Sequence, residues 1–166
     1  MVFVSPKPTL PRWLCEHILL GTLPWPQGVC QSYSNFSSVY TLHDSYLLGT
    51  YQSAEIYGET VLCFLWDGLW LPESVSRQVS QNEPVFLLIK VTKTLGTALS
   101  EGTMDKPDKQ PRRILKTEHV NVDDQQVLVI DDTQHNTLTV VFSGRLHFLA
   151  LDSKKRLIEL NMAFSL

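Results

Sequence analysis

The stretch "PVFLLIKV", residues 84–91, indicates the fold class of this chain. Its apolar residues are consecutive rather than alternating, which predicts a β-strand buried on both faces over "PVFLLIKVTKTL", residues 84–95. The run is strand-sized and too short to cross a membrane. The polar stretch before it, "LPESVSRQVSQNEP", carries Val75 and Val79 at i and i+4, and this spacing predicts one or two helical turns.

Other short segments rich in β-branched, aromatic and leucine residues predict further strands. They are "SVYTLHD", "SYLLGTYQ", "ETVLCFLW", "ILKTEHVNV", "QQVLVIDD", "TLTVVFSG" and "RLHFLALDS", with "KKRLIELNMAF" closing the chain as strand or short helix. Residues 96–113 show no periodicity and predict a mobile loop. The pattern predicts a mainly β fold with short helices, in the form of a small barrel or sandwich.

A helix is predicted within "LPRWLCEHILLG", residues 10–21. Its apolar stripe consists of Leu10, Trp13, Leu14 and Ile18. Thr9 is the expected N-cap and Gly21 the expected end, while residues 1–8 form a flexible, proline-broken arm and "VCQSYSNFSS" an irregular connection. A helix before the strands, and a second between the third and fourth, favour one OB-like barrel domain over residues 1–166.

Composition excludes some classes of function. The chain has 166 residues, with 14 Lys and Arg against 17 Asp and Glu, for a net charge of −3. This balance argues against a protein built mainly to bind phosphate backbones. Cys15, Cys30 and Cys63 form no CxxC motif, and the N-terminus carries no apolar signal segment, which favours free thiols in a reducing intracellular compartment.

No catalytic or cofactor motif is found. The sequence lacks GxxxxGK, GxGxxG, HExxH and GxSxG, and its five histidines lack metal-ligand spacing. The pairs Asp123-Asp124 and Asp131-Asp132 are interpreted as turn formers rather than cation ligands. We therefore expect no enzyme activity, no metal and no cofactor. A Cys–His dyad stays open, because its partners need only meet in space.

Two groups of residues are candidates for protein binding. Trp13 is interpreted either as a core aromatic or as an interface anchor. The polar strip with Glu73, Arg77 and Glu83 is interpreted either as a solvated connection or as a surface for protein recognition. Of Trp66 and Trp70, one is expected to face outward.

A third group is basic. It comprises two clusters, interpreted either as solvated charge runs or as a weak nucleic-acid contact: Lys106, Lys109, Arg112, Arg113 and Lys116, then Lys154, Lys155 and Arg156. A single-strand-binding barrel needs aromatic side chains beside its basic residues. The clusters have none interleaved in sequence, which disfavours nucleic acid as the main ligand.

Two stretches together carry a family resemblance. The stretch "RWLCEHILLG", followed by "ETVLCFLWDGLWLPESVSRQVSQNEPVFLLIKV", resembles the telomerase-recruiting OB-fold family. That family includes the yeast telomerase accessory subunit "ever shorter telomeres three" and the OB domain of the shelterin protein that recruits telomerase in animals. The matching helix positions are Trp13, Leu14, Glu16, Ile18 and Leu19.

The resemblance implies a non-catalytic subunit of the telomerase particle at telomeres in the nucleus. Its partners would be the reverse transcriptase or another accessory subunit, with no membrane involved and at most weak contact with telomerase RNA or single-stranded DNA. The carried-over partner contacts are Trp13, Glu16, Glu73, Arg77 and Glu83. The alternative is an OB-fold protein that binds single-stranded DNA or RNA.

Overall fold

The computed structural model describes residues 9–25, 32–52, 58–80, 83–100 and 112–160. The fold is mainly β with short helices, as predicted. The helices are α1 (Arg12–Leu20), α2 (Tyr33–Ser37), the 3₁₀ helix η1 (Gly68–Trp70) and α3 (Glu73–Ser76). The strands are β1 (Tyr46–Gln52), β2 (Thr60–Leu65), β3 (Val85–Val91), β4 (Thr94–Ser100), β5 (Arg112–Val122), β6 (Gln125–Asp132), β7 (Thr137–Phe142), β8 (Leu146–Asp152) and β9 (Leu157–Ile158).

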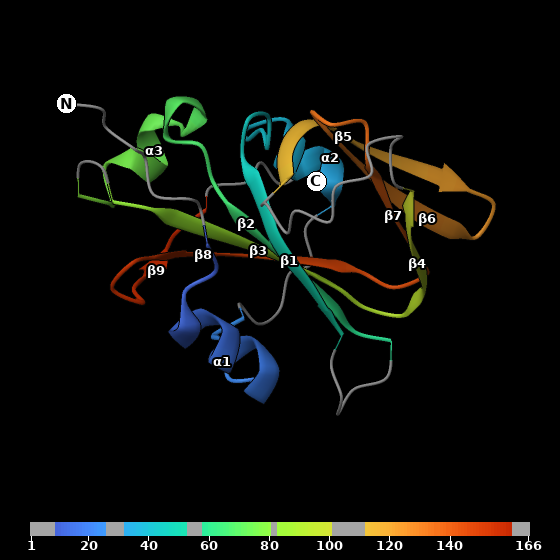
Figure 1. Ribbon diagram of the computed structural model, residues 1–166, viewed down its shortest axis with the longest axis horizontal. Coiled ribbons are helices and arrows are strands. Elements are labelled where there is room, and N and C mark those ends of the chain that lie inside the picture. Colours follow the sequence, from blue (N-terminus) through green and yellow to red (C-terminus); the bar gives the residue numbers. More distant parts are fainter. Residues whose placement is uncertain (1–8, 26–31, 53–57, 81–82, 101–111, 161–166) are drawn as a thin grey trace.

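These strands form one antiparallel sheet, in the order β4-β7-β6-β5-β1-β2-β3-β8-β9 (Figure 1). Among the described residues strand pairing ends at β4 and β9, so these strands do not close the sheet by a ladder of their own. Within the sheet, β1 and β5 pair over only two residues, Tyr46 with Arg113 and Leu47 with Arg112. This junction divides the sheet into two halves.

The first half, which we call the helix-covered half, consists of β1, β2, β3 and β8. Helix α1 lies on one face of it, and α2 and α3 lie on the other (Figure 1). In β3, Leu88 packs in the cluster with α1, while Leu87 and Ile89 pack in the cluster with α2 and α3. This two-sided burial is why the sequence of β3 is continuously apolar, as predicted. The strand ends at Val91 and not at Leu95 as expected, because the chain turns at Lys93, at φ 51°, into β4.

The second half, which we call the open half, consists of β5, β6, β7 and β4. In β6 and β7 the buried residues alternate with partly exposed ones. Leu128, Ile130, Val140 and Phe142 point into the same core cluster as the inner face of the helix-covered half. One hydrophobic core therefore lies between the two halves.

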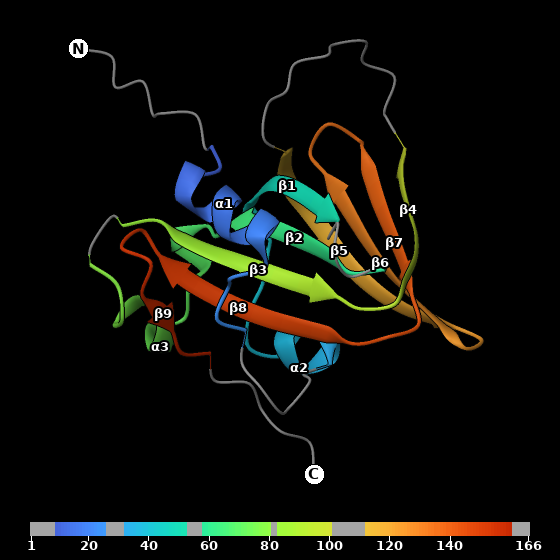
Figure 2. The same cartoon turned by 90° about the horizontal axis from the view of Figure 1, so that it is seen from below.

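The two halves also meet at a corner where β3 continues into β4 and β7 into β8 (Figure 2). The Thr92 N–H donates to the Arg145 carbonyl at 3.0 Å, and the Arg145 N–H donates to the Thr92 hydroxyl at 2.8 Å. A Cβ at Gly144 would lie 2.3 Å from the Thr92 carbonyl oxygen. Glycine is therefore required at residue 144 because the two backbones approach so closely.

Helix α1 differs slightly from its predicted bounds. Its N-cap is Pro11, which makes no side-chain cap, so the prediction of Thr9 was wrong. Proline suits this position because its fixed φ matches the extended backbone, at φ −61° and ψ 142°. The prediction of Gly21 as the end is confirmed, since Gly21 adopts the left-handed conformation at φ 67°.

Two sequence predictions are wrong. "VCQSYSNFSS" was expected to be irregular, but it contains α2, whose N-cap Ser32 accepts a hydrogen bond from the Asn35 N–H. Tyr33 and Phe36, one turn apart, bury one side of this helix in the core. "SVYTLHD", residues 38–44, was expected to be a strand, but it is a connection that begins at the C-cap of α2 and buries Tyr40 and Leu42.

The prediction of a mobile loop over residues 96–113 is wrong at both ends. Residues 96–100 belong to β4 and residues 112–113 begin β5, while 101–111 lie outside the described residues. β4 escaped detection because a bulge at Leu95 interrupts its register and because, apart from Leu95 and Leu99, its residues are small. The arm over residues 1–8 also lies outside the described residues.

Candidate functional site

Trp13 is half-buried, so it fits both interpretations that the sequence left open. Its ring meets the Phe86 ring edge-to-face at 6.1 Å, which fixes α1 on the sheet. On its other side, the Lys155 ammonium lies 5.7 Å from the ring centroid, within cation–π range. Trp13 thus anchors α1 and also contributes to the surface.

Lys155 is held in place by a tight turn between β8 and β9. The buried carboxylate of Asp152 accepts hydrogen bonds from the N–H groups of Lys154, at 2.9 Å, and Arg156, at 2.8 Å. It also accepts one from the Arg156 guanidinium at 3.0 Å. Burial opposes ionisation of Asp152, but these donors outweigh it and lower the pKa of the carboxyl. Lys155 itself adopts φ 67° at the exposed tip of the turn.

The same turn reaches Glu83, which precedes β3. The Ser153 hydroxyl donates a hydrogen bond to the Glu83 carboxylate. Trp13, Glu83, Ser153, Lys154 and Lys155 therefore form one continuous surface, which we call the Trp13 rim. The structure brings together two predicted partner-binding residues, Trp13 and Glu83, that are far apart in sequence.

Glu73 and Arg77 lie on the other side of the short edge strand β9. They form an exposed ion pair on α3, with 2.5 Å between Arg77 Nη2 and Glu73 Oε1. The neighbouring Gln78 ties α3 to β9, because its side chain both donates to the Glu159 carbonyl and accepts from the Glu159 N–H. Helices α1 and α3 pack on opposite faces of the sheet, so β9 and its turn are the link between them.

Glu16 lies on the exposed face of α1. It pairs with Arg12 one turn earlier, at 3.2 Å, and both side chains are largely in solvent. Such a pair contributes little to stability, so it leaves both charges available to a partner. Leu19 and Leu20 follow on the same helix and are 64% and 70% exposed.

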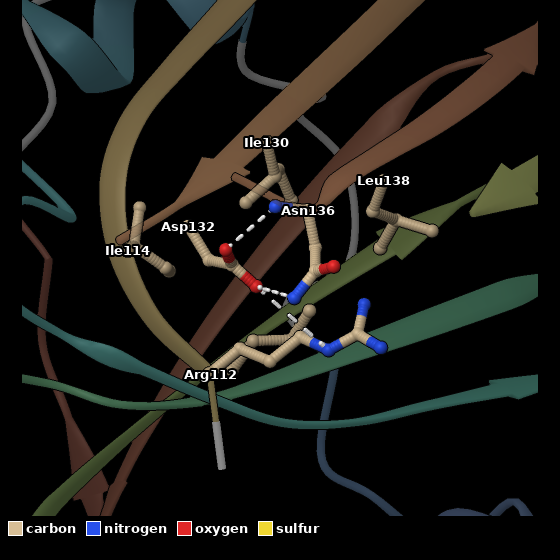
Figure 3. Close-up of a pocket in the computed structure, with 7 residues that line it drawn as sticks. Arg112, Ile114, Ile130, Asp132, Asn136 and Leu138 are labelled. Atoms are coloured by element: carbon tan, nitrogen blue, oxygen red, sulfur yellow. Dashed lines mark hydrogen bonds and ion pairs between the residues drawn. The ribbon is translucent and has the colours of Figure 1, made fainter. Parts of the chain in front are cut away.

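The basic group is not assembled into one patch within the described residues. Lys106 and Lys109 lie outside them. Arg112 Nε lies 3.9 Å from the buried carboxylate of Asp132, beside a hollow that has no space for a water molecule (Figure 3). Arg113 instead pairs with Asp44 at 3.3 Å. Both guanidinium groups are therefore partly neutralised by carboxylates of this chain.

Sequence reasoning missed what surrounds Arg113. Asp44, at φ 65°, also accepts a hydrogen bond from the Trp70 indole at 3.2 Å. The His43 ring contacts the Trp70 ring edge-to-face at 5.5 Å. Trp70 is 47% exposed while Trp66 is 3% exposed, so the prediction that one of them faces outward is confirmed. An exposed aromatic thus stands near a basic residue after all, though the two are well separated in sequence.

The described residues do not assemble an evident reactive centre. Cys63 is buried beneath α1. Its pKa is raised mainly by this burial and to a smaller extent by the nearby Cys15 thiol, which disfavours a reactive thiolate. No group of three or more His, Cys, Asp or Glu side chains capable of holding a metal occurs among the described residues. Asp132 caps the turn between β6 and β7, as its interpretation as a turn former predicted.

No helix in the described part of the chain is both long and apolar enough to span a bilayer. In comparisons with known proteins, no family model, curated protein or solved structure matches this chain. The family resemblance of the sequence therefore rests on its quoted residues alone.

Proposed function

We propose that this chain is a non-catalytic, OB-like subunit of the telomerase particle that works through protein contacts. The observation that carries the proposal is the Trp13 rim, where a half-exposed tryptophan, a lysine above it and a glutamate form one surface. Tryptophan is enriched at binding hot spots, and mixed charge around it favours a specific protein partner.

The arrangement of elements supports the OB-like part of the proposal. The sheet curls around one core, and short connections at its corner join β4 and β7, at one end of the strand order, to β3 and β8, next to the other end. Helix α1 precedes the strands, and α3 leads into the apolar strand β3. α3 lies between the second and third strands instead of the third and fourth as expected, because "SVYTLHD" forms no strand. We infer a barrel-like body whose closure uses the corner instead of ladder pairing.

The test is affinity purification of the tagged full-length chain from its source cell. We expect a reverse transcriptase and its template RNA to co-purify with the unmodified chain. Lys155→Glu and Glu83→Arg, which reverse charges on the Trp13 rim, should reduce recovery of both by at least about tenfold. Glu118→Arg reverses an exposed charge on β5, far from the rim, and is the matched control.

Two results would count against the proposal. Recovery of the chain without any reverse transcriptase would remove the telomerase assignment. Unchanged recovery of the particle with both rim variants would place the contact elsewhere. Circular dichroism of each variant separates loss of binding from loss of fold.

Binding of single-stranded nucleic acid is the second candidate, and Trp70 beside Arg113 favours it. Stacking of bases on an exposed aromatic, with a guanidinium for the phosphate, is how such proteins bind. Asp44 neutralises this Arg113, so we expect only weak binding of oligonucleotides at physiological salt. Nanomolar affinity with a steep salt dependence, lost in Trp70→Ala, would favour this candidate over the adaptor.

A further inference from the structure

The two edges of the sheet are protected very differently. Edge strand β9 has two residues and directly follows Lys154, Lys155 and Arg156. Short length and lysines are the usual means by which proteins prevent an edge from pairing with another chain. Edge strand β4 has seven residues, "TLGTALS", and none of them is charged.

β4 is also apolar and accessible. Leu95 is 57% exposed and Leu99 is 44% exposed. Among the described residues, β4 forms a ladder with β7 alone. After the bulge at Leu95, the strand runs in regular register from Gly96 to Ser100. This segment therefore offers a row of backbone donors and acceptors on its outer side.

We propose that β4 pairs with β4 of a second copy of this chain, antiparallel across a two-fold axis at Ala98. Ala98 is the centre of the regular segment, so this register uses all of it. It places Ala98 opposite Ala98 and Thr97 opposite Leu99 of the other copy. No charged residue lies within the paired segment, so no like charges oppose each other across the axis.

This pairing also explains why Leu99 is exposed. Leu99 is in register with Leu138 on β7, which belongs to the core between the two halves of the sheet. Leu99 therefore faces the same side as the core, but among the described residues no strand lies on the outer flank of β4. Thr97 of the second copy would supply that neighbour, and the sheet would continue from one copy into the other.

An edge-to-edge contact of this length buries less surface than a permanent dimer does, so we expect a dissociation constant of about 1–100 µM. Sedimentation velocity of the purified full-length chain over this concentration range should show a monomer–dimer equilibrium. Ala98→Lys should raise the dissociation constant at least about tenfold, because two ammonium groups would then oppose each other across the axis. Val120→Lys, at an exposed valine three strands away on β5, is the matched control and should leave it unchanged.

Cysteine cross-linking tests the register. Under mild oxidation Ala98→Cys alone should give a covalent dimer, and the unmodified chain should not. Thr97→Cys and Leu99→Cys should cross-link poorly alone but efficiently when mixed, because each lies opposite the other across the axis. Thermal melts of each variant, in which Ala98→Lys must match the unmodified chain, exclude unfolding as the cause.

A chain that remains monomeric up to about 500 µM, well above the dissociation constant expected for a contact of this size, would overturn the proposal. So would a dimer that Ala98→Lys leaves intact, or one that Val120→Lys disrupts, since the latter would place the contact on the sheet face. These measurements need no telomerase component, so their failure is separate from failure of the proposed function.

Discussion

The helix-covered half and the open half of the sheet use the same antiparallel ladder but bury their side chains differently. β3 buries residues on both faces, since α1 lies on one side and the shared core on the other. β6 buries alternate residues only, because no described helix covers its outer face. Helix α1, which carries the half-exposed Trp13, therefore causes β2, β3 and β8 of the helix-covered half to be buried on both faces.

The corner that joins the halves should give the largest effect. We expect Gly144→Ala to lower the free energy of unfolding by about 4 kcal/mol or more, because the added Cβ cannot fit beside the Thr92 carbonyl. Urea denaturation measures this. Gly96→Ala, where nothing lies within 4 Å of the added Cβ, should change stability by less than about 1 kcal/mol. Equal effects would mean that the corner tolerates separation of its backbones.

Removing the contact of Trp13 with Phe86 should show whether the two halves of the sheet differ in local stability. We expect Trp13→Ala to cost about 2 kcal/mol, below the range for a fully buried tryptophan. Hydrogen exchange should show lost protection in β2 and β3 but little change in β6 and β7. Uniform loss across all four strands would mean that the halves unfold as one unit.

The turn at Asp152 should give a smaller, pH-dependent effect. The lowered pKa of Asp152 means that its carboxylate stabilises the fold above the ordinary aspartate pKa, and that this contribution is lost as the pH falls from that value through the lowered pKa of the folded state. Asp152→Asn should cost about 1–2 kcal/mol at pH 7. It should also flatten the fall of stability at acid pH, which thermal melts between about pH 2 and 7 would record. A variant with an unchanged fall of stability at acid pH would contradict this role.

The smallest effect is expected on α3. Glu73→Arg and Arg77→Glu should each change stability by less than about 0.5 kcal/mol, since both side chains are exposed. In the affinity purification, either reversal should weaken recovery of the particle if the partner also spans β9. The double reversal restores the ion pair, so a shared loss in all three variants would assign the effect to the partner rather than to the helix.

Much of the fold could be predicted because a strand that is buried on both faces has a continuous run of apolar residues in the sequence. "PVFLLIKV" and "ETVLCFLW" are continuous apolar runs, and both are central strands. α2 could not be found as easily, because five residues carry only one apolar pair, Tyr33 and Phe36. β4 was missed because small residues at an edge need no hydrophobic alternation.

The candidate site was predictable only in its separate residues. Trp13 and Glu83 stood out by type, but nothing local shows that Ser153 and Lys155 bring them onto one surface. The contact between Trp70 and Asp44 likewise joins residues from distant elements. Such contacts between distant residues depend on the order of the strands in the sheet, which local sequence patterns do not encode.

The turns closed by Asp132 and Asp152 also bear on the order in which the chain folds. Each carboxylate accepts N–H groups two and four residues ahead, so each turn closes using only its own neighbours. Hairpins of this kind form in microseconds. The pairings of β3 with β8 and of β4 with β7 must instead wait for distant segments to meet. The slow step of folding is therefore expected to be the closing of the corner at Gly144, long after its flanking hairpins exist.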